Sequence, residues 1–183
     1  MNSNRSIIGV IGSGGQAYTE LSVPLGQWIA QNGFYLINGG GDGTMTAVAK
    51  AFTEVPQRKG LSIGVVPSID FCDESEKRSV YSNPFNYPNP YIEIPIKTHL
   101  PLSGKDGLKT GSRNHIVVLT ANIIVALPGA SGTRSEIQLC LDYKKPLIIL
   151  DPIDCWTEFK NTSARFVQNI EEATIEITKF FQY

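Results

Sequence analysis

Short apolar runs, separated by glycine, proline and asparagine, recur along the chain. Each is rich in isoleucine, leucine or valine, a pattern typical of strands buried on both faces of a sheet. One run, at residues 91–96, alternates only weakly and contains Pro95, which predicts either a strand at a sheet edge or a strand that stops early. The predicted strands cover residues 6–12, 34–38, 61–66, 91–96, 123–127 and 146–150.

Apolar residues at helical spacing fill most intervals between these strands. Leu21, Leu25 and Ile29 recur every four residues, as on one face of a helix. Because helices and strands alternate, we expect an α/β fold, a Rossmann-like, doubly wound, mostly parallel sheet with helices on both faces. The length of 183 residues predicts a single domain over residues 1–183. The predicted helices cover residues 19–32, 111–120, 133–143 and 162–180, with one more starting at residue 44.

The composition excludes several classes of protein. The net charge is −1, so we expect no nucleic-acid partner. The N-terminus is polar and no apolar run could span a membrane, so we expect no signal peptide, no membrane partner and a cytoplasmic location. The cysteines and histidines lack metal-ligand spacing, so no metal site is expected, and Cys140 is predicted to be a core residue. These residues are Cys72, Cys140, Cys155, His99 and His115.

Three glycine-rich junctions, at residues 12–15, 39–43 and 128–133, each follow a predicted strand. The carboxyl ends of parallel strands meet at one edge of a sheet, where ligands bind in open α/β folds, so we expect the junctions to share a site. Surplus glycines indicate close approach of a ligand or of a neighbouring backbone. The first junction matches a dinucleotide-binding pattern, but no acid ends the second strand, so a nicotinamide cofactor is not expected.

The third junction is the most informative, because small residues there leave backbone N–H groups uncovered at a helix start. Such groups bind anions, which predicts the floor of a phosphate pocket. Glu136, one turn into the helix, has two interpretations: an acid facing the ligand, or the end of a Thr133-x-x-Glu136 capping box. Arg113, near the start of its own helix, opposes the helix dipole, so it either has an anionic partner or is an ordinary surface arginine.

Two polar loops, at residues 70–90 and 98–110, are long for a small domain, and such loops are often functional. We expect them to cover the site. Asp42 either contacts a ligand hydroxyl or is a solvated turn residue. Trp28, Trp156 and the aromatic C-terminus (Phe180, Phe181, Tyr183) are candidates for an interface or for the core.

The sequence Pro-Gly-Ala-Ser-Gly-Thr-Arg-Ser-Glu at 128–136 resembles the P-G-G-x-G-T-x-x-E motif of the LOG family, phosphoribohydrolases often labelled "lysine decarboxylase". The Gly-Gly-Gly-Asp-Gly sequence at 39–43 is similar to that family's earlier glycine motif, and Arg113 falls where the enzymes carry a catalytic arginine. Ala130 replaces a glycine, and the Met-His-x-Arg-Lys run is absent. These departures resemble the sister branch that includes molybdenum cofactor carrier proteins.

The resemblance implies a homodimer or homotetramer that binds and carries molybdenum cofactor, a phosphate-bearing pterin, at the C-terminal edge of the sheet. Molybdoenzymes or cofactor-synthesis proteins would be partners. One alternative is a nucleoside 5′-monophosphate phosphoribohydrolase with Arg113 and Glu136 as catalytic residues; another is a nucleotide-sensing module. The candidate ligand- and phosphate-binding residues are Gly12, Ser13, Gly14, Gly15, Gly39, Gly40, Gly41, Asp42, Gly43, Thr44, Arg113, Asn114, Pro128, Gly129, Ala130, Ser131, Gly132 and Thr133.

Overall fold

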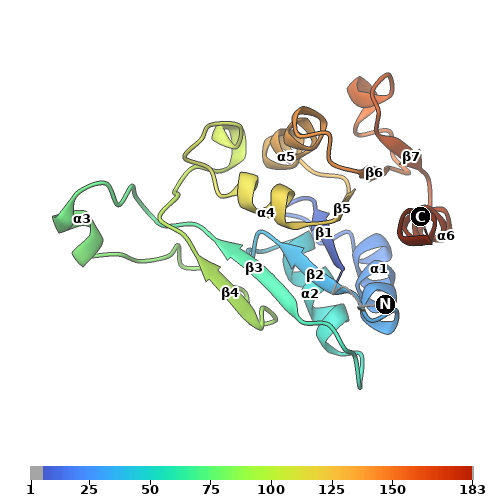
Figure 1. The fold of residues 1–183 in the computed structure, drawn as a ribbon, viewed down its shortest axis with the longest axis horizontal. Helices are drawn as coiled ribbons and strands as arrows, with labels where there is room; N and C mark the ends of the chain where they lie inside the picture. Colours follow the sequence, from blue (N-terminus) through green and yellow to red (C-terminus); the bar gives the residue numbers. More distant parts are fainter. Residues whose placement is uncertain (1–5, 183) are drawn as a thin grey trace.

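The structure, a computed structural model, describes residues 6–182 and contains a seven-stranded sheet (Figure 1). All pairings are parallel, and the strand order is β4-β3-β2-β1-β5-β6-β7. The predicted Rossmann-like α/β fold is therefore confirmed, with every strand parallel. The strands are β1 (Ile7–Ile11), β2 (Tyr35–Asn38), β3 (Ser62–Val66), β4 (Ile94–Lys97), β5 (Ile123–Ala126), β6 (Leu147–Leu150) and β7 (Arg165–Val167).

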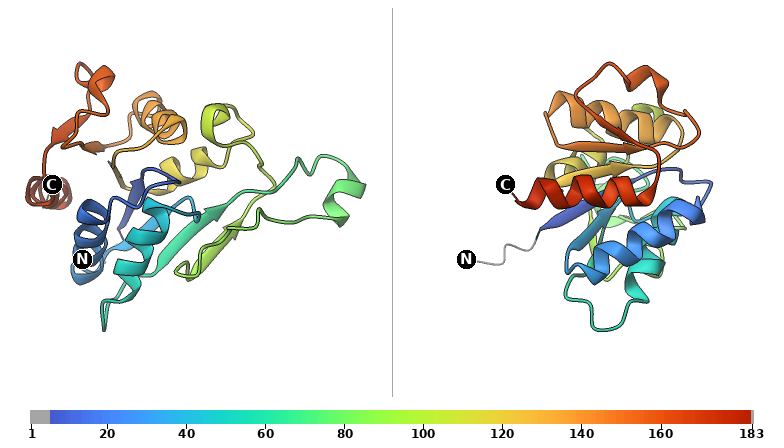
Figure 2. Two further views of the ribbon diagram at one scale, coloured as in Figure 1. Left: turned by 180° about the vertical axis from the view of Figure 1, so that it is seen from behind. Right: turned by 90° about the vertical axis from the view of Figure 1, so that its right-hand side faces the viewer.

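Helices cover both faces of the sheet because successive strand residues point to opposite faces. In β5, Ile123 and Val125 join the core beneath one set of helices, and Ile124 and Ala126 join the core beneath the other. Both cores need apolar residues, which explains the unbroken apolar runs. The first set is α1 (Thr19–Gln31), α2 (Thr44–Thr53) and α6 (Ile170–Gln182), and the second is α4 (Asn114–Thr120) and α5 (Ser131–Asp142) (Figure 2).

The chain changes direction across the sheet between β1 and β5, which lie side by side at its centre. The turns after β1, β2 and β5 meet at this point. The Ser13 amide donates a hydrogen bond to the Pro128 carbonyl (3.2 Å), and the Thr44 amide donates one to the Ser13 carbonyl (2.9 Å). We call residues 12–15, 39–43 and 128–133 the β1, β2 and β5 turns. Sheet topology alone thus brings three distant segments together.

Several element boundaries differ from the sequence prediction. Helix α4 and strand β4 each begin three residues later than expected, at Asn114 and Ile94. The helix predicted over residues 162–180 is wrong at its start, because residues 165–167 form β7 against β6 and α6 begins only at Ile170. Helix α5 begins at Ser131 rather than Thr133, with Ala130 as its N-cap and no side-chain capping bond. Thr133 is thus inside the first turn, and the proposed Thr133–Glu136 capping box is wrong.

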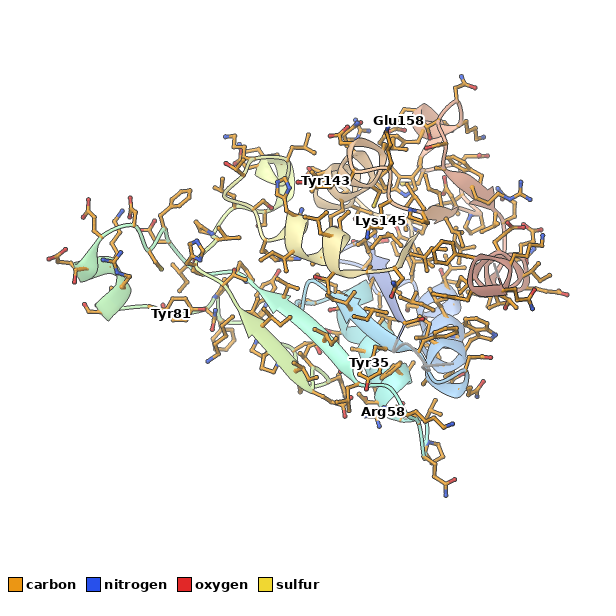
Figure 3. The ribbon with its side chains drawn as sticks, viewed as in Figure 1. Tyr35, Arg58, Tyr81, Tyr143, Lys145 and Glu158 are labelled. Atoms are coloured by element: carbon orange, nitrogen blue, oxygen red, sulfur yellow. The ribbon has the colours of Figure 1, made fainter. Side chains whose placement is uncertain are left out.

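A long excursion of residues 67–90, which we call the arm, connects β3 to β4 and carries the short helix α3 (Ser75–Ser79) (Figure 1). Tyr81 lies where the arm leaves the sheet, and its hydroxyl donates a hydrogen bond to the Thr98 carbonyl (3.2 Å; Figure 3). Phe85 is fully exposed on the arm. The strand that follows, β4, lies at the sheet edge, which is one of the two alternatives that Pro95 indicated. The other long loop contains a short 3-10 helix, η1 (Gly104–Asp106).

The aromatic residues proposed for an interface divide between core and surface. Trp156 is buried, Phe180 is partly exposed, and Trp28 and Phe181 stack on Phe34 from either side. Tyr183 lies outside the described residues. Cys140 is buried, as predicted. Among residues 6–182, no helix has the length and apolar character needed to cross a membrane.

Candidate functional site

A cavity of about 210 Å³ opens at the carboxyl edge of the sheet, where the β1, β2 and β5 turns meet. It is lined by residues from β1, all three turns, α2, α4, α5, the arm and the loop around η1. Nine of the lining residues were candidates from the sequence: Gly12, Gly14, Gly39, Arg113, Asn114, Ala130, Gly132, Thr133 and Glu136. The remainder are Val10, Ile11, Met45, Tyr87, Ser103 and Gly104.

The other candidates surround the cavity without lining it, and several of them shape its turns. The Ser13 hydroxyl accepts hydrogen bonds from the amides of Gly15 and Gln16 (3.1 and 3.0 Å), which fixes the β1 turn. The Thr44 hydroxyl donates to the Gln16 carbonyl (3.1 Å) and so ties α2 to the same turn. The candidates outside the cavity lining are Ser13, Gly15, Gly40, Gly41, Asp42, Gly43, Thr44, Pro128, Gly129 and Ser131.

The glycines of the β2 turn pack against other parts of the protein. A methyl group at Gly39 would collide with the Arg113 guanidinium, and one at Gly41 would lie 2.6 Å from the Tyr87 hydroxyl oxygen. Gly43 has φ 62°, and a methyl group there would collide with the Ser13 carbonyl oxygen. The predicted close approach of a neighbouring backbone is therefore found at Gly43, whereas side chains approach Gly39 and Gly41.

Asp42 has a partner within the protein. Its carboxylate accepts a hydrogen bond from the Asn86 side-chain amide (2.5 Å), which joins the β2 turn to the arm. Asn89 strengthens the same junction, because its side chain donates to the Gly41 carbonyl and its amide donates to the Gly40 carbonyl (both 2.8 Å). These hydrogen bonds therefore hold the C-terminal end of the arm against the rim of the cavity.

The β5 turn contributes the start of α5 to the cavity. Ala130, Gly132 and Thr133 line the wall, and the first turn of any α-helix has N–H groups without partners inside the helix. Ala130, the N-cap residue of α5, provides no side-chain hydrogen bond to these N–H groups. Gly129 lies against Thr133, whose side chain would collide with a methyl group at that position. The helix dipole adds positive potential at this end, so the wall favours an anion.

Arg113 lies just before α4 with its guanidinium in the cavity wall and only 5% of its surface exposed. Its Nη1 is 3.9 Å from the Glu136 Oε1, too far for a hydrogen bond. Among the described residues, its Nε and Nη1 have no hydrogen-bond partner. Buried guanidinium donors are costly when unpaired, so this side chain is suited to an anion that enters the cavity.

Glu136, on α5, faces the same cavity and is also buried. Burial raises the pKa of its carboxyl group to about 7, because desolvation of the carboxylate outweighs the attraction of the Arg113 guanidinium. Near neutral pH the group therefore exists in both forms. The protonated form leaves the positive charge of Arg113 uncompensated and can itself donate a hydrogen bond.

Six lining residues were not candidates from the sequence: Val10, Ile11, Met45, Tyr87, Ser103 and Gly104. Tyr87 belongs to the arm, and Ser103 and Gly104 belong to the other long loop. The sequence predicted both loops as covers but gave no signal for which side chains reach the site. The described residues contain no cluster of potential metal ligands, and His115 instead contacts the Tyr143 hydroxyl (2.7 Å).

The fold and cavity together define a doubly wound α/β protein with a cavity at its topological switch point. Within that class the family is specific: residues 5–179 match the SLOG cluster4 family, and the chain belongs to it. An uncharacterized protein of Archaeoglobus fulgidus is 29% identical over 148 residues, which cover 79% of this chain and 80% of that protein.

Two similar solved structures have been described by function. One is the molybdenum cofactor carrier protein of Chlamydomonas reinhardtii, with a TM-score of 0.71 and 25% identity over 98% of this chain and 100% of that one. The other is the molybdenum cofactor binding protein of Rippkaea orientalis, with a TM-score of 0.72 and 25% identity over 98% and 99% of the two chains. The resemblance that the sequence motifs indicated is confirmed.

Proposed function

We propose that this protein binds and carries molybdenum cofactor, a phosphate-bearing pterin, in the cavity at the carboxyl edge of its sheet. The observation that carries the proposal is the buried Arg113 guanidinium, whose Nε and Nη1 have no partner among the described residues. A planar guanidinium binds phosphate through two parallel hydrogen bonds. The start of α5 adds backbone donors on an adjoining part of the wall.

The charged side chains of the cavity wall favour binding of an anion together with uptake of one proton by the protein. Arg113 and Glu136 are the charged side chains that line the cavity in the described part of the chain. An anion beside Glu136 disfavours its carboxylate form, so binding raises its pKa further and takes up a proton. The pair then becomes one cation and one neutral donor, both suited to phosphate oxygens.

Relatives support the identity of the ligand. The two solved structures described as molybdenum cofactor carrier and binding proteins align with almost the whole chain. A homodimer or homotetramer, delivery to molybdoenzymes or cofactor-synthesis proteins, and a cytoplasmic location complete the proposal. The phosphoribohydrolase with Arg113 and Glu136 as catalytic residues and the nucleotide-sensing module stay alternatives that the same experiments distinguish.

The test is to purify the protein from cells grown with molybdate and to measure molybdenum and oxidised pterin fluorescence per protomer. We expect Arg113→Ala to lower both at least about tenfold, the effect of losing hydrogen bonds to a charged group. Arg134→Ala is the matched control, since Arg134 lies on α5 but is exposed and paired with Glu158 outside the cavity. Arg113→Ala should fold, because an unpaired Glu136 can take up a proton.

Wild-type protein that contains neither molybdenum nor pterin would overturn the proposal. Adenosine 5′-monophosphate distinguishes the alternatives. Release of free adenine that Glu136→Gln abolishes would establish the phosphoribohydrolase, and tight binding without release would favour the sensing module.

A further inference from the structure

Tyr87 contributes an aromatic ring to the cavity wall from the returning end of the arm. The side chain is half-buried and lies against Gly41, where an added methyl group would be 2.6 Å from its hydroxyl oxygen and 2.7 Å from the ring carbon that bears it. Within the described residues, its hydroxyl makes no hydrogen bond. The ring is therefore held by its neighbours while its hydroxyl is free for a ligand.

Hydrogen bonds on both sides of Tyr87 fix its backbone before any ligand binds. Asn86 bonds to the Asp42 carboxylate, and Asn89 bonds to the carbonyls of Gly40 and Gly41. All of these bonds join the arm to the β2 turn. A side chain positioned in this way loses little conformational entropy on binding.

The ring and the cation of the cavity are close enough to contact one ligand. The Arg113 guanidinium packs on Gly39 and the Tyr87 ring packs on Gly41. These two glycines are two residues apart, so their Cα atoms are separated by at most about 7 Å. Val10, Ile11 and Met45 line the same cavity and give it apolar surface. The cavity therefore combines a cation that suits phosphate with an aromatic and apolar surface that suits a flat, weakly polar ring.

We infer that Tyr87 is the specificity-determining residue of this site, recognising the flat heterocycle of a ligand whose phosphate is bound at Arg113. The inference rests on the proposed function for the site and extends it by assigning recognition of the heterocycle to one residue. Aromatic rings stack on flat heterocycles of many kinds, and the hydroxyl can bond to a ring nitrogen or carbonyl. A phosphate compound without a heterocycle would gain nothing from Tyr87.

The test compares three probes: a pterin with a phosphorylated side chain, adenosine 5′-monophosphate, and ribose 5-phosphate, which has no heterocycle. Dissociation constants are measured by calorimetry for wild type, Tyr87→Ala and Tyr87→Phe. We expect Tyr87→Ala to weaken binding of the preferred heterocyclic probe at least about tenfold and to change that of ribose 5-phosphate less than about twofold. Tyr87→Phe should restore most of the loss.

Phe85→Ala is the matched control, because Phe85 is a fully exposed aromatic on the same arm and does not line the cavity. It should bind every probe as wild type does. An equal loss for all three probes in Tyr87→Ala would show that Tyr87 only supports the cavity, and no loss for any probe would show that the ring is not used. Either result overturns the inference. A wild-type protein without molybdenum, in which Tyr87 still discriminates adenosine 5′-monophosphate from ribose 5-phosphate, would contradict the proposed ligand alone.

Discussion

The β2 turn and the β5 turn follow neighbouring parts of the same sheet edge and are both rich in small residues, yet they face different partners. In the β2 turn, the Arg113 guanidinium packs on Gly39, the Tyr87 ring packs on Gly41, and the β1 turn packs on Gly43. In the β5 turn, Ala130 and Gly132 line the cavity, and the nearest atom to a methyl group at Gly132 would be 3.6 Å away.

The difference shows that glycines in turns at the carboxyl edge of a sheet can make room either for other groups of the protein or for a ligand. In the β2 turn, most glycines make room for groups that the protein itself brings to the site. In the β5 turn, the lack of side-chain bulk leaves the start of α5 open to the cavity. Substitutions should therefore act on different properties: stability at Gly41 and Gly43 of the β2 turn, which lie outside the cavity lining, and ligand binding at Ala130 and Gly132 of the β5 turn.

The largest effect on stability is expected for Gly43→Ala. The added methyl group would collide with the Ser13 carbonyl oxygen and lie 2.8 Å from the Gly14 carbonyl carbon, and the backbone at Gly43 has φ 62° and ψ −126°. Overpacking and a conformation that only glycine adopts readily together cost about 3–4 kcal/mol. Urea unfolding measures this loss.

Gly15→Ala is the control for the same substitution in a neighbouring turn. Gly15 is exposed, and no described atom lies within 4 Å of a methyl group added there. Its free energy of unfolding should change by less than about 0.5 kcal/mol. If Gly43→Ala were as stable as Gly15→Ala, the β2 turn would not be shaped by packing.

The sequence predicted the fold well where one pattern dominates. Apolar runs identified five strands and a weakly alternating run identified β4, and turn residues placed the strand boundaries within three positions. The seventh strand was missed because Phe166 stands four residues before Ile170, which continues the helical spacing of α6 toward its N-terminus. A three-residue edge strand has too few positions to show an alternation of its own.

For the site, sequence reasoning succeeded where topology determines position. Turns after neighbouring parallel strands must meet, so the association of the three junctions was predictable. The placement of Tyr87 depends on how the arm folds back on the β2 turn through Asn89, a contact between residues 48 positions apart. No local pattern encodes such a contact. The capping-box interpretation of Glu136 failed because α5 starts at Ser131, within a run of small residues that looks like a turn.

The second largest expected effect is a pH dependence of the free energy of unfolding, which arises from Glu136. Its pKa is about 7 in the folded protein against an ordinary value of 4.5. Between these values the folded protein binds the proton more strongly than the unfolded chain does, so stability falls as pH rises and levels off above about 7. The loss from this group amounts to about 3 kcal/mol, at 1.36 kcal/mol per pKa unit. Urea unfolding at pH 5, 6, 7 and 8 measures it.

Glu136→Gln should remove this part of the pH dependence, because glutamine does not titrate. Glu158→Gln is the matched control, since Glu158 pairs with Arg134 outside the cavity and its side chain is 37% exposed. Its pH profile should follow that of wild type. If the free energy of unfolding changed with pH in the same way for Glu136→Gln and wild type, the Glu136 carboxyl group would already be ionised at pH 5.

The smallest effect on stability is expected for Gly132→Ala, and it separates the two turns most directly. Gly132 lies in the first turn of α5, and its nearest neighbours for an added methyl group are Gly104 atoms at 3.6 and 3.9 Å, an ordinary contact. Alanine favours helix over glycine by up to about 1 kcal/mol, so stability should stay the same or rise slightly. Because Gly132 lines the cavity, calorimetry with inorganic phosphate should show weaker binding even though stability is kept. A loss of stability as large as that of Gly43→Ala would mean that both turns are governed by packing.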